Sequence, residues 1–170
     1  MELRLAGAVV RSWRPGDDQS LALHGNNREV WINLRDAFPH PYTVHDARLW
    51  IEWASGHRPE THFALEVEGA AAGGIGFVIQ PDVHCCSAEI GFWLGQPFWG
   101  RGIMTQAVKA VTAHALREHG LRRVYAQVFA WNPASVRVLE KAGYVREGVL
   151  RSSAVKDGKV TDQVVLAVTQ

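Results

Sequence analysis

The sequence is poor in cysteine and has no excess of charge of either sign. Its 170 residues include two cysteines, Cys85 and Cys86, and these are adjacent, so they cannot form an ordinary long-range disulfide. This favours a reducing, cytoplasmic location. Eighteen Lys and Arg residues stand against 17 Asp and Glu residues, and no basic block is present. Nucleic-acid binding is therefore not indicated.

Long apolar runs and linkers are also missing. A membrane span would need about 18 consecutive apolar residues, and the sequence contains no such run. The first seven residues lack the apolar core of an export signal. No internal repeat or low-complexity tract divides the chain. We therefore expect a single domain over residues 1–170, large enough to bury roughly 70% of its unfolded surface.

The strongest local signal is the ten-residue stretch 96–105, Gln-Pro-Phe-Trp-Gly-Arg-Gly-Ile-Met-Thr. It follows a predicted buried strand over 88–94 and precedes a predicted helix over about 103–118. Gly100 and Gly102 allow a tight turn, and the first four amides of a helix have no partner within the helix. Such a nest of donors, reinforced by the helix dipole, suits a pyrophosphate. The two glycines alone do not distinguish a mononucleotide site from a dinucleotide site.

The first sixty residues predict mainly helices. Alternation indicates a strand over about 8–13, and apolar spacing favours helices over 18–25, 27–37 and 43–55. Either Asp17 or Asp18 is expected to cap the first helix, and Thr43 the third.

From residue 61 the pattern is mostly that of strands. Asn132 is expected to cap a helix that starts at Pro133 and ends at Gly143. The Asp157-Gly158 pair is typical of a hairpin turn. The predicted strands are 62–68, 72–80, 87–94, 121–130, 144–155 and 160–168.

The second half of the chain, from Phe63 to Ala167, resembles the GNAT superfamily of N-acetyltransferases, and within it the branch of ribosomal-protein-type acetyltransferases. The segments that carry the resemblance are Ala88–Trp93, Phe98–Ala107, Asn132–Tyr144 and Glu147–Arg151, in this order and spacing.

The resemblance implies an α+β fold with a mostly antiparallel, twisted sheet of about seven strands and helices on both faces. Strands 88–95 and 121–130 would be neighbours that splay apart. Residues 61–170 would form the acetyl-CoA-binding core, and residues 1–60 would supply the helices on the acceptor side.

The resemblance also implies acetyl-CoA as the cosubstrate. Its pantetheine arm would bond to strand amides near Phe92, Trp93 and Leu94, and Asn132 would hold a cofactor amide. The pyrophosphate would lie on the loop amides of Trp99, Gly100, Arg101, Gly102, Ile103, Met104 and Thr105.

Two positions depart from the superfamily pattern. Pro97 stands where Gln or Arg is usual, and Gln96 is one residue early, so the loop amides must carry more of the binding. Leu139 stands where many members have a tyrosine that protonates the leaving thiolate. For that role the sequence offers Ser135, one turn earlier, which is equally suited to satisfying backbone groups in the first turn of a helix.

Acetyl transfer also needs a base and a polarised carbonyl. Glu89 is the candidate base, directly or through water, because a carboxylate is unusual within an apolar strand; the alternative is a side chain that faces solvent or caps a neighbouring strand. A strand N–H near Leu94 would donate to the thioester oxygen as it gains charge. A covalent acetyl-cysteine mechanism through Cys85 or Cys86 is disfavoured, since no histidine is placed to activate either thiol.

The acceptor remains open at this level. Trp31, Phe38 and Tyr42, with Trp50 and Trp53, are candidates for an aromatic acceptor pocket, although aromatics at helical spacing are more often core. The expected activity is transfer to a primary amine, either a protein N-terminus or a small amine such as an amino acid, polyamine or aminoglycoside. A non-catalytic acetyl-CoA-binding regulator is the other alternative. The histidine spacing predicts no metal site, and a homodimer is compatible with the sequence.

Overall fold

The computed structural model describes all residues, Met1–Gln170, and mixes helices and strands as expected. It contains eight strands in one sheet, in the order β1-β2-β3-β4-β5-β6-β8-β7, where the sequence predicted about seven. The strands are β1 (Glu2–Leu5), β2 (Ala8–Arg11), β3 (His62–Val67), β4 (Ala70–Ile79), β5 (Ser87–Leu94), β6 (Arg123–Phe129), β7 (Val145–Lys156) and β8 (Lys159–Thr169). The helices are α1 (Asp18–Gly25), α2 (Arg28–Trp31), α3 (Val44–Gly56), α4 (Ile103–Glu118) and α5 (Pro133–Lys141), with short 3₁₀ turns η1 (Asp82–His84) and η2 (Gln96–Phe98).

The chain forms two compact units. The first comprises Met1–Gly76 and Phe92–Ala107, and the second comprises Phe77–Gly91 and Val108–Gln170. The boundaries therefore fall within β4, β5 and α4. The expectation of one domain over 1–170, divided near residue 60, stays a prediction.

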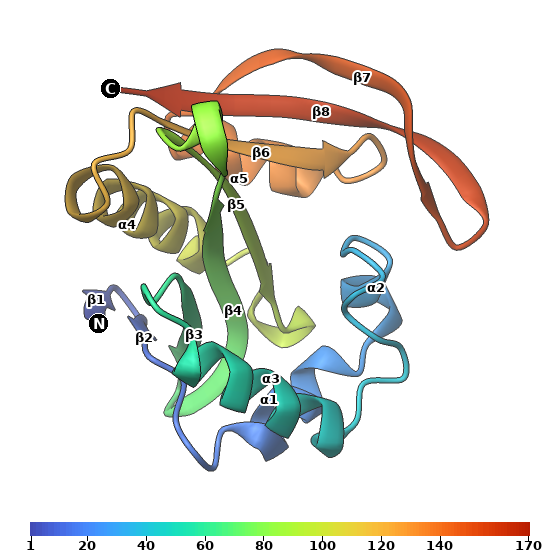
Figure 1. Cartoon of the computed structure of the whole chain (residues 1–170). Helices are drawn as coiled ribbons and strands as arrows, with labels where there is room; N and C mark the ends of the chain where they lie inside the picture. Colours follow the sequence, from blue (N-terminus) through green and yellow to red (C-terminus); the bar gives the residue numbers. More distant parts are fainter. The chain divides into compact units, whose positions relative to one another are not determined.

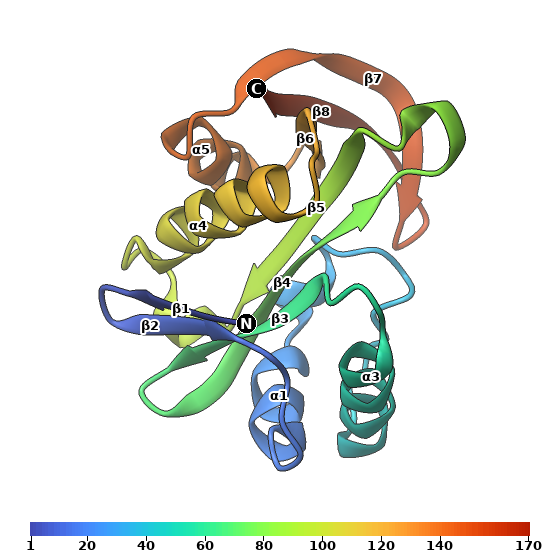
Figure 2. The same ribbon diagram turned by 60° about the vertical axis from the view of Figure 1, so that its left-hand side comes forward.

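In the first unit, antiparallel strands are covered by α1 and α3. Strands β1 to β3 pair in sequence order, β3 pairs with β4, and α1 and α3 lie side by side (Figure 2). The helices bury an apolar stripe against small residues of β3 and β4. Its members are Trp13, Leu21, Ala22, Tyr42, Ala47, Ile51, Ala54, Ala64 and Ala71. Thr43 caps α3 through a complete capping box, as predicted.

Three local expectations for this unit were wrong. The sequence reading missed β1, which pairs with β2 across the Ala6-Gly7 turn. Helix α2 ends at Trp31 instead of residue 37, because the next amides, of Asn33 and Leu34, bond three residues back and the helix does not propagate.

The third error concerns Asp17, which occupies the N-cap position of α1 without a capping hydrogen bond. Its carboxylate accepts two hydrogen bonds of 2.8 Å from the guanidinium of Arg11, and Arg11 also pairs with Glu66. Arg11 and Asp17 are both buried, so their charges must be paired within the protein. The acidic side chain that looked like a helix cap is the partner of a buried cation.

In the second unit, β6, β8 and β7 form an antiparallel ribbon against which α5 packs (Figure 1). The turn between β7 and β8 is Asp157-Gly158, with φ of 51° and 72°, which confirms the predicted hairpin. Strand β5 pairs in parallel with β6 over Ser87–Glu89 and Arg123–Tyr125, and the pairing ends there. The expectation that these two strands are neighbours is thus confirmed, and the splay beyond this short ladder stays a prediction.

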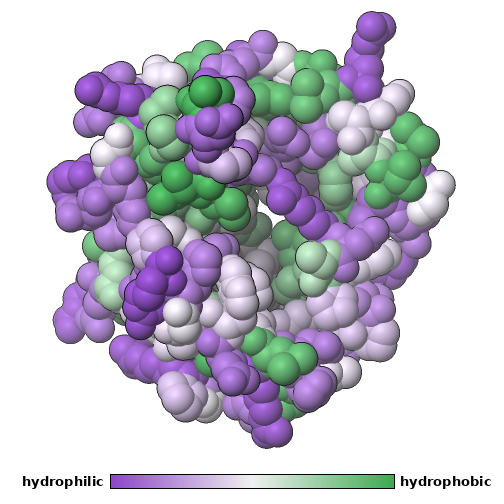
Figure 3. Space-filling model, in the orientation of Figure 1, coloured by the Kyte–Doolittle hydropathy of each residue, from purple (hydrophilic) through white to green (hydrophobic).

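No helix is sufficiently long and apolar to cross a membrane. In the view of Figure 3, hydrophobic residues are interspersed with hydrophilic ones. Several large apolar side chains of β7 and β8 are nevertheless exposed: Val145, Val149, Leu150, Val155 and Val160.

Candidate functional site

The glycine loop of the first unit has the conformation that its sequence predicts. After the 3₁₀ turn η2, Gly100 and Gly102 have φ of 76° and 74°, a region that residues with a Cβ rarely adopt. The first backbone bond at the start of α4 is donated by Gln106 to the carbonyl of Gly102, at 3.3 Å. The amides of residues 100–105 donate to no backbone carbonyl of this unit.

These amides and the dipole of the 16-residue helix α4 fit a phosphate group. A Cβ built on Gly100 or Gly102 meets no protein atom within 4 Å, so the backbone is accessible from the side on which a Cβ would lie. Among the predicted cofactor-binding residues, Ile103 and Met104 bury their side chains, at 3% and 8% exposure. Their contribution to a ligand is therefore limited to the backbone.

Side chains tie the loop to neighbouring segments. Arg101 donates a 2.9 Å hydrogen bond to Glu68 in the β3–β4 turn, and its guanidinium lies 5.5 Å from the centre of the Phe98 ring. Trp99 donates from Nε1 to the carbonyl oxygen of Leu94, at 2.6 Å. Trp99 thus ties the start of the glycine-containing turn to the end of β5, and Arg101 makes its contact from the middle of the turn.

The end of β5 lies directly before this loop. The amide of Gly95 donates to Ala72 on β4 at 2.7 Å. Because successive residues of an extended strand direct their amides to opposite edges, the N–H and C=O of Leu94 point away from β4. The same alternation directs the amide of Phe92 away from β4. The carbonyl of Leu94 is the group that Trp99 binds.

In the second unit, Asn132 and Ser135 are brought together. Asn132 caps α5, as predicted, by accepting from the amide of Ser135 at 3.1 Å. Its Nδ2 also donates to Ser135 Oγ at 2.9 Å, so the serine hydroxyl hydrogen is left to donate elsewhere. Leu139, one turn further on, is fully buried and carries no polar atom.

Glu89 is a half-buried residue of β5 in the same unit, and it lies in register with Tyr125 of β6. It is the last β5 residue paired with β6, so it stands where the two strands begin to diverge. A carboxylate at this position is only partly shielded from water, which suits a group that must release protons to solvent.

The aromatic residues predicted to bind the acceptor do not form one group. Phe38 stacks on Tyr42 at 4.5 Å between ring centres and meets Trp93 edge-on at 5.4 Å. Tyr42 is only 5% exposed and belongs to the core, where burial raises its pKa. Trp31 stacks on His40, with 5.4 Å between the ring centres.

Trp50 and Trp53 contact each other and the rings of His57 and His62, and Trp50 also packs against the core cluster that contains Tyr42. Burial and the charge of His57 lower the pKa of His62 to about 4.

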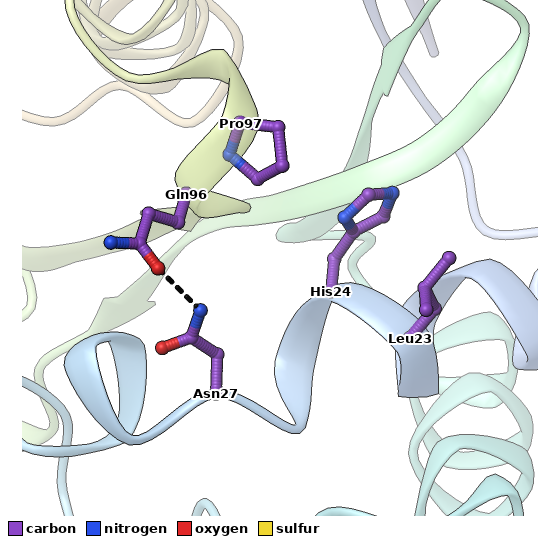
Figure 4. Close-up of a pocket in the computed structure, with 5 residues that line it drawn as sticks. All are labelled: Leu23, His24, Asn27, Gln96 and Pro97. Carbon is purple, nitrogen blue, oxygen red and sulfur yellow. Dashed lines mark hydrogen bonds between the residues drawn. The ribbon is translucent and has the colours of Figure 1, made fainter.

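Sequence reasoning missed a pocket of about 420 Å³ next to the loop (Figure 4). It is lined by Leu23, His24, Asn27, Gln96 and Pro97. Asn27 donates to the side-chain oxygen of Gln96 at 2.8 Å, and burial lowers the pKa of His24. Of these residues, only Gln96 and Pro97 were identifiable from the sequence, as part of the glycine loop. His24 and Asn27 lie about 70 residues away along the chain and belong to no recognisable motif.

The remaining candidate groups are the two cysteines and the possible metal ligands. Cys85 and Cys86 are exposed free thiols beside η1. No group of three or more His, Cys, Asp or Glu side chains is placed to hold a metal ion.

Residues 8–145 match the family described as Acetyltransferase (GNAT) domain. Among curated proteins, "Probable N-acetyltransferase YjcK" of Bacillus subtilis is 43% identical over 82 residues, which cover 48% of this chain and 45% of that protein. The ribosomal-protein-serine acetyltransferase of Escherichia coli is 36% identical over 67 residues, covering 39% of this chain and 37% of that protein.

Among solved structures, RimL, a ribosomal L7/L12 alpha-N-protein acetyltransferase in complex with coenzyme A, superposes with a TM-score of 0.87 at 21% identity. The match covers 99% of this chain and 98% of that one, and at this identity it shows a shared fold. With the curated relatives, the matched region spans less than half of each protein's length. The family match covers most of the chain, from β2 to the start of β7, and includes the glycine loop, so the chain belongs to the GNAT acetyltransferase family.

Proposed function

We propose that this protein transfers the acetyl group of acetyl-CoA to a primary amine, and that the amine is the N-terminal α-amine of a protein. Membership of the GNAT family and the naming of its relatives as N-acetyltransferases support the reaction class. The observation that carries the proposal is the row of unpaired amides over residues 100–105, at the start of α4. The choice of acceptor rests on the E. coli relative, which is named for a ribosomal-protein substrate.

The loop amides bind the pyrophosphate in this proposal. Pro97 has no N–H and no polar side chain, so it cannot replace the Gln or Arg that is usual at this point. The side-chain oxygen of Gln96, one residue earlier, accepts a hydrogen bond from Asn27, which fixes the direction of the Gln96 amide. The amides of Gly100 to Thr105 provide donors without any such side chain. The proposed binding therefore depends on the backbone conformation that the two glycines permit.

The amide of Leu94 polarises the thioester. It points to the edge of β5 that β4 does not cover, and it can donate to a carbonyl oxygen that gains negative charge as the amine attacks. The amide of Phe92 points to the same edge and is proposed to hold the pantetheine arm. Both donors are fixed by the strand, so they need little reorganisation during the reaction.

Glu89 and Ser135 are proposed to move the protons. Glu89 takes the proton of the attacking amine, directly or through water, and its partly exposed position allows the proton to pass to solvent. Ser135 donates to the departing thiolate, since Asn132 already supplies a hydrogen bond to its Oγ and orients the hydroxyl. A free α-amine has a pKa of about 8 and a thiol about 8.5, so weak acid and base groups are sufficient.

The test is release of free coenzyme A thiol from acetyl-CoA in the presence of a panel of amines. The panel pairs each peptide that begins with Ser, Ala or Met with the same peptide acetylated at its N-terminus, and adds amino acids, polyamines and aminoglycosides. We expect the free peptides to be the fastest acceptors and the blocked peptides to be inactive, even where they contain lysine.

Other outcomes separate the alternatives. Faster transfer to a small amine than to any peptide would replace the acceptor and keep the chemistry. Saturable acetyl-CoA binding without accelerated thiol release by any amine would favour a non-catalytic regulator.

A further inference from the structure

Trp99 links the glycine loop to the end of β5 by one hydrogen bond. Its Nε1 donates to the carbonyl oxygen of Leu94 at 2.6 Å, just below the usual range for N–H···O bonds. The Trp99 amide also donates to the carbonyl of Gln96, at 3.1 Å, which closes the 3₁₀ turn η2. Backbone and side chain of the same residue therefore fix the connection between strand and loop.

The bond acts on a peptide group that the sheet leaves unpaired. Because the Gly95 amide bonds to β4, the carbonyl of Leu94 faces the other edge, where pairing of β5 with β6 has already ended. Without the indole this carbonyl would have no partner in the first unit. Trp99 is 45% exposed, so its position depends on this bond more than on burial of the ring.

Two groups with different proposed tasks lie on either side of this bond. Gly100, which follows Trp99 directly, begins the row of amides proposed to hold the pyrophosphate. Leu94 carries the amide proposed to polarise the thioester. A shift of the Leu94 backbone would misdirect its N–H, and a misplacement of about 1 Å can cost a hundredfold in rate.

We propose that Trp99 is a positioning residue that holds the Leu94 backbone in the orientation needed for acetyl transfer, at a fixed position relative to the phosphate-binding loop. This inference rests on the proposed function of Leu94 and of the loop. The Trp99 indole acts through Leu94 and does not itself contact the reacting atoms. Its effect is therefore larger on the chemical step than on binding of coenzyme A.

The test replaces Trp99 by Phe, which keeps an aromatic ring and removes the N–H donor. We expect kcat to fall about tenfold while the Kd of free coenzyme A, measured by calorimetry, changes by less than about threefold. A Trp99→His variant, which restores a ring N–H, should recover part of kcat. The matched control is Trp13→Phe: the buried Trp13 Nε1 has no hydrogen-bond partner, so losing it should leave kcat unchanged.

The ratio of acetyl-CoA affinity to coenzyme A affinity provides a readout that needs no turnover. A donor aimed at the thioester oxygen makes the wild-type protein prefer acetyl-CoA, and Trp99→Phe should reduce that preference. Unchanged kcat and an unchanged ratio would overturn the role of Trp99, and so would equal losses of kcat and coenzyme A affinity. Absence of transfer to every amine by the wild-type protein would instead count against the proposed function, and the affinity ratio would still decide the role of Trp99.

Discussion

Replacing Gly102 by alanine perturbs the loop backbone at one point. Gly102 has φ of 74°, and a Cβ added there finds no protein atom within 4 Å. The cost to folding is therefore backbone strain alone, roughly 1–2 kcal/mol for a non-glycine residue in the left-handed region. For a chain of this size, each 1 kcal/mol lowers the Tm by roughly 2–4 °C.

The cost to ligand binding is expected to be larger. To relieve the strain the loop must rotate its peptide groups, which redirects the amides of residues 100–105 that lack a backbone partner in the first unit. A hydrogen bond to a charged group contributes about 1.5–3 kcal/mol, and every 1.4 kcal/mol is a factor of ten. Loss of one such bond to the pyrophosphate weakens coenzyme A binding by at least about tenfold.

The other end of α4 offers a matched control. Gly120 follows the helix with φ of 62°, and a Cβ there also meets nothing within 4 Å. Gly120→Ala should lower the Tm by a similar amount and leave the affinity for coenzyme A unchanged. Thermal unfolding without ligand and calorimetric titration with coenzyme A measure the two effects separately. Equal affinities in the two variants would refute the assignment of the pyrophosphate to this loop.

Three other perturbations have defined outcomes. Ser135→Ala removes the hydroxyl proposed to protonate the thiolate and keeps the backbone cap from Asn132. We expect kcat to fall by about tenfold or more with little change in the Kd of coenzyme A. Equal losses of kcat and of coenzyme A affinity would indicate a binding role for Ser135. Glu68→Gln releases the exposed Arg101 of the loop from its ion pair, so coenzyme A should bind severalfold more tightly at low salt, and this gain should disappear at high salt. Weaker binding would instead mean that the ion pair holds the loop in place. The pKa of His62 is lowered to about 4 in the folded protein, so the unfolded chain binds a proton at His62 more readily than the folded chain does. The free energy of unfolding should therefore fall as the pH drops from about 6.5 towards 4. Urea titrations at several pH values should show this decrease, and the His62→Asn variant should lack it.

The sequence was most informative where chemistry and backbone conformation are local. Gly100 and Gly102 adopt the positive φ that the loop required, α4 begins at Ile103, and Asn132 caps α5. Each of these features is determined by residues within one turn of each other, and the residue types involved have few alternative uses. The Asp157-Gly158 turn was predictable for the same reason.

Features that depend on distant partners were not predictable. Asp17 fits a helix cap in sequence, but its partner is the buried Arg11 on β2. Asn27 and Gln96 are 69 residues apart, and Arg101 and Glu68 are 33 apart. Hydrogen bonds between single polar side chains leave no periodic pattern, so only the folded chain identifies them.

These distant bonds also explain how a loop without the usual Gln or Arg can be organised to bind an anion. A flexible loop would lose conformational entropy on binding, at roughly 1–2 kcal/mol for each residue that becomes ordered. Here Asn27 holds Gln96, and Trp99 holds the Leu94 carbonyl. These side chains fix the start of the loop, and the backbone amides are left for the proposed ligand. In the proposed binding mode, preorganisation of this kind would reduce the entropic cost of binding, so that backbone amides can hold the pyrophosphate without a Gln or Arg side chain.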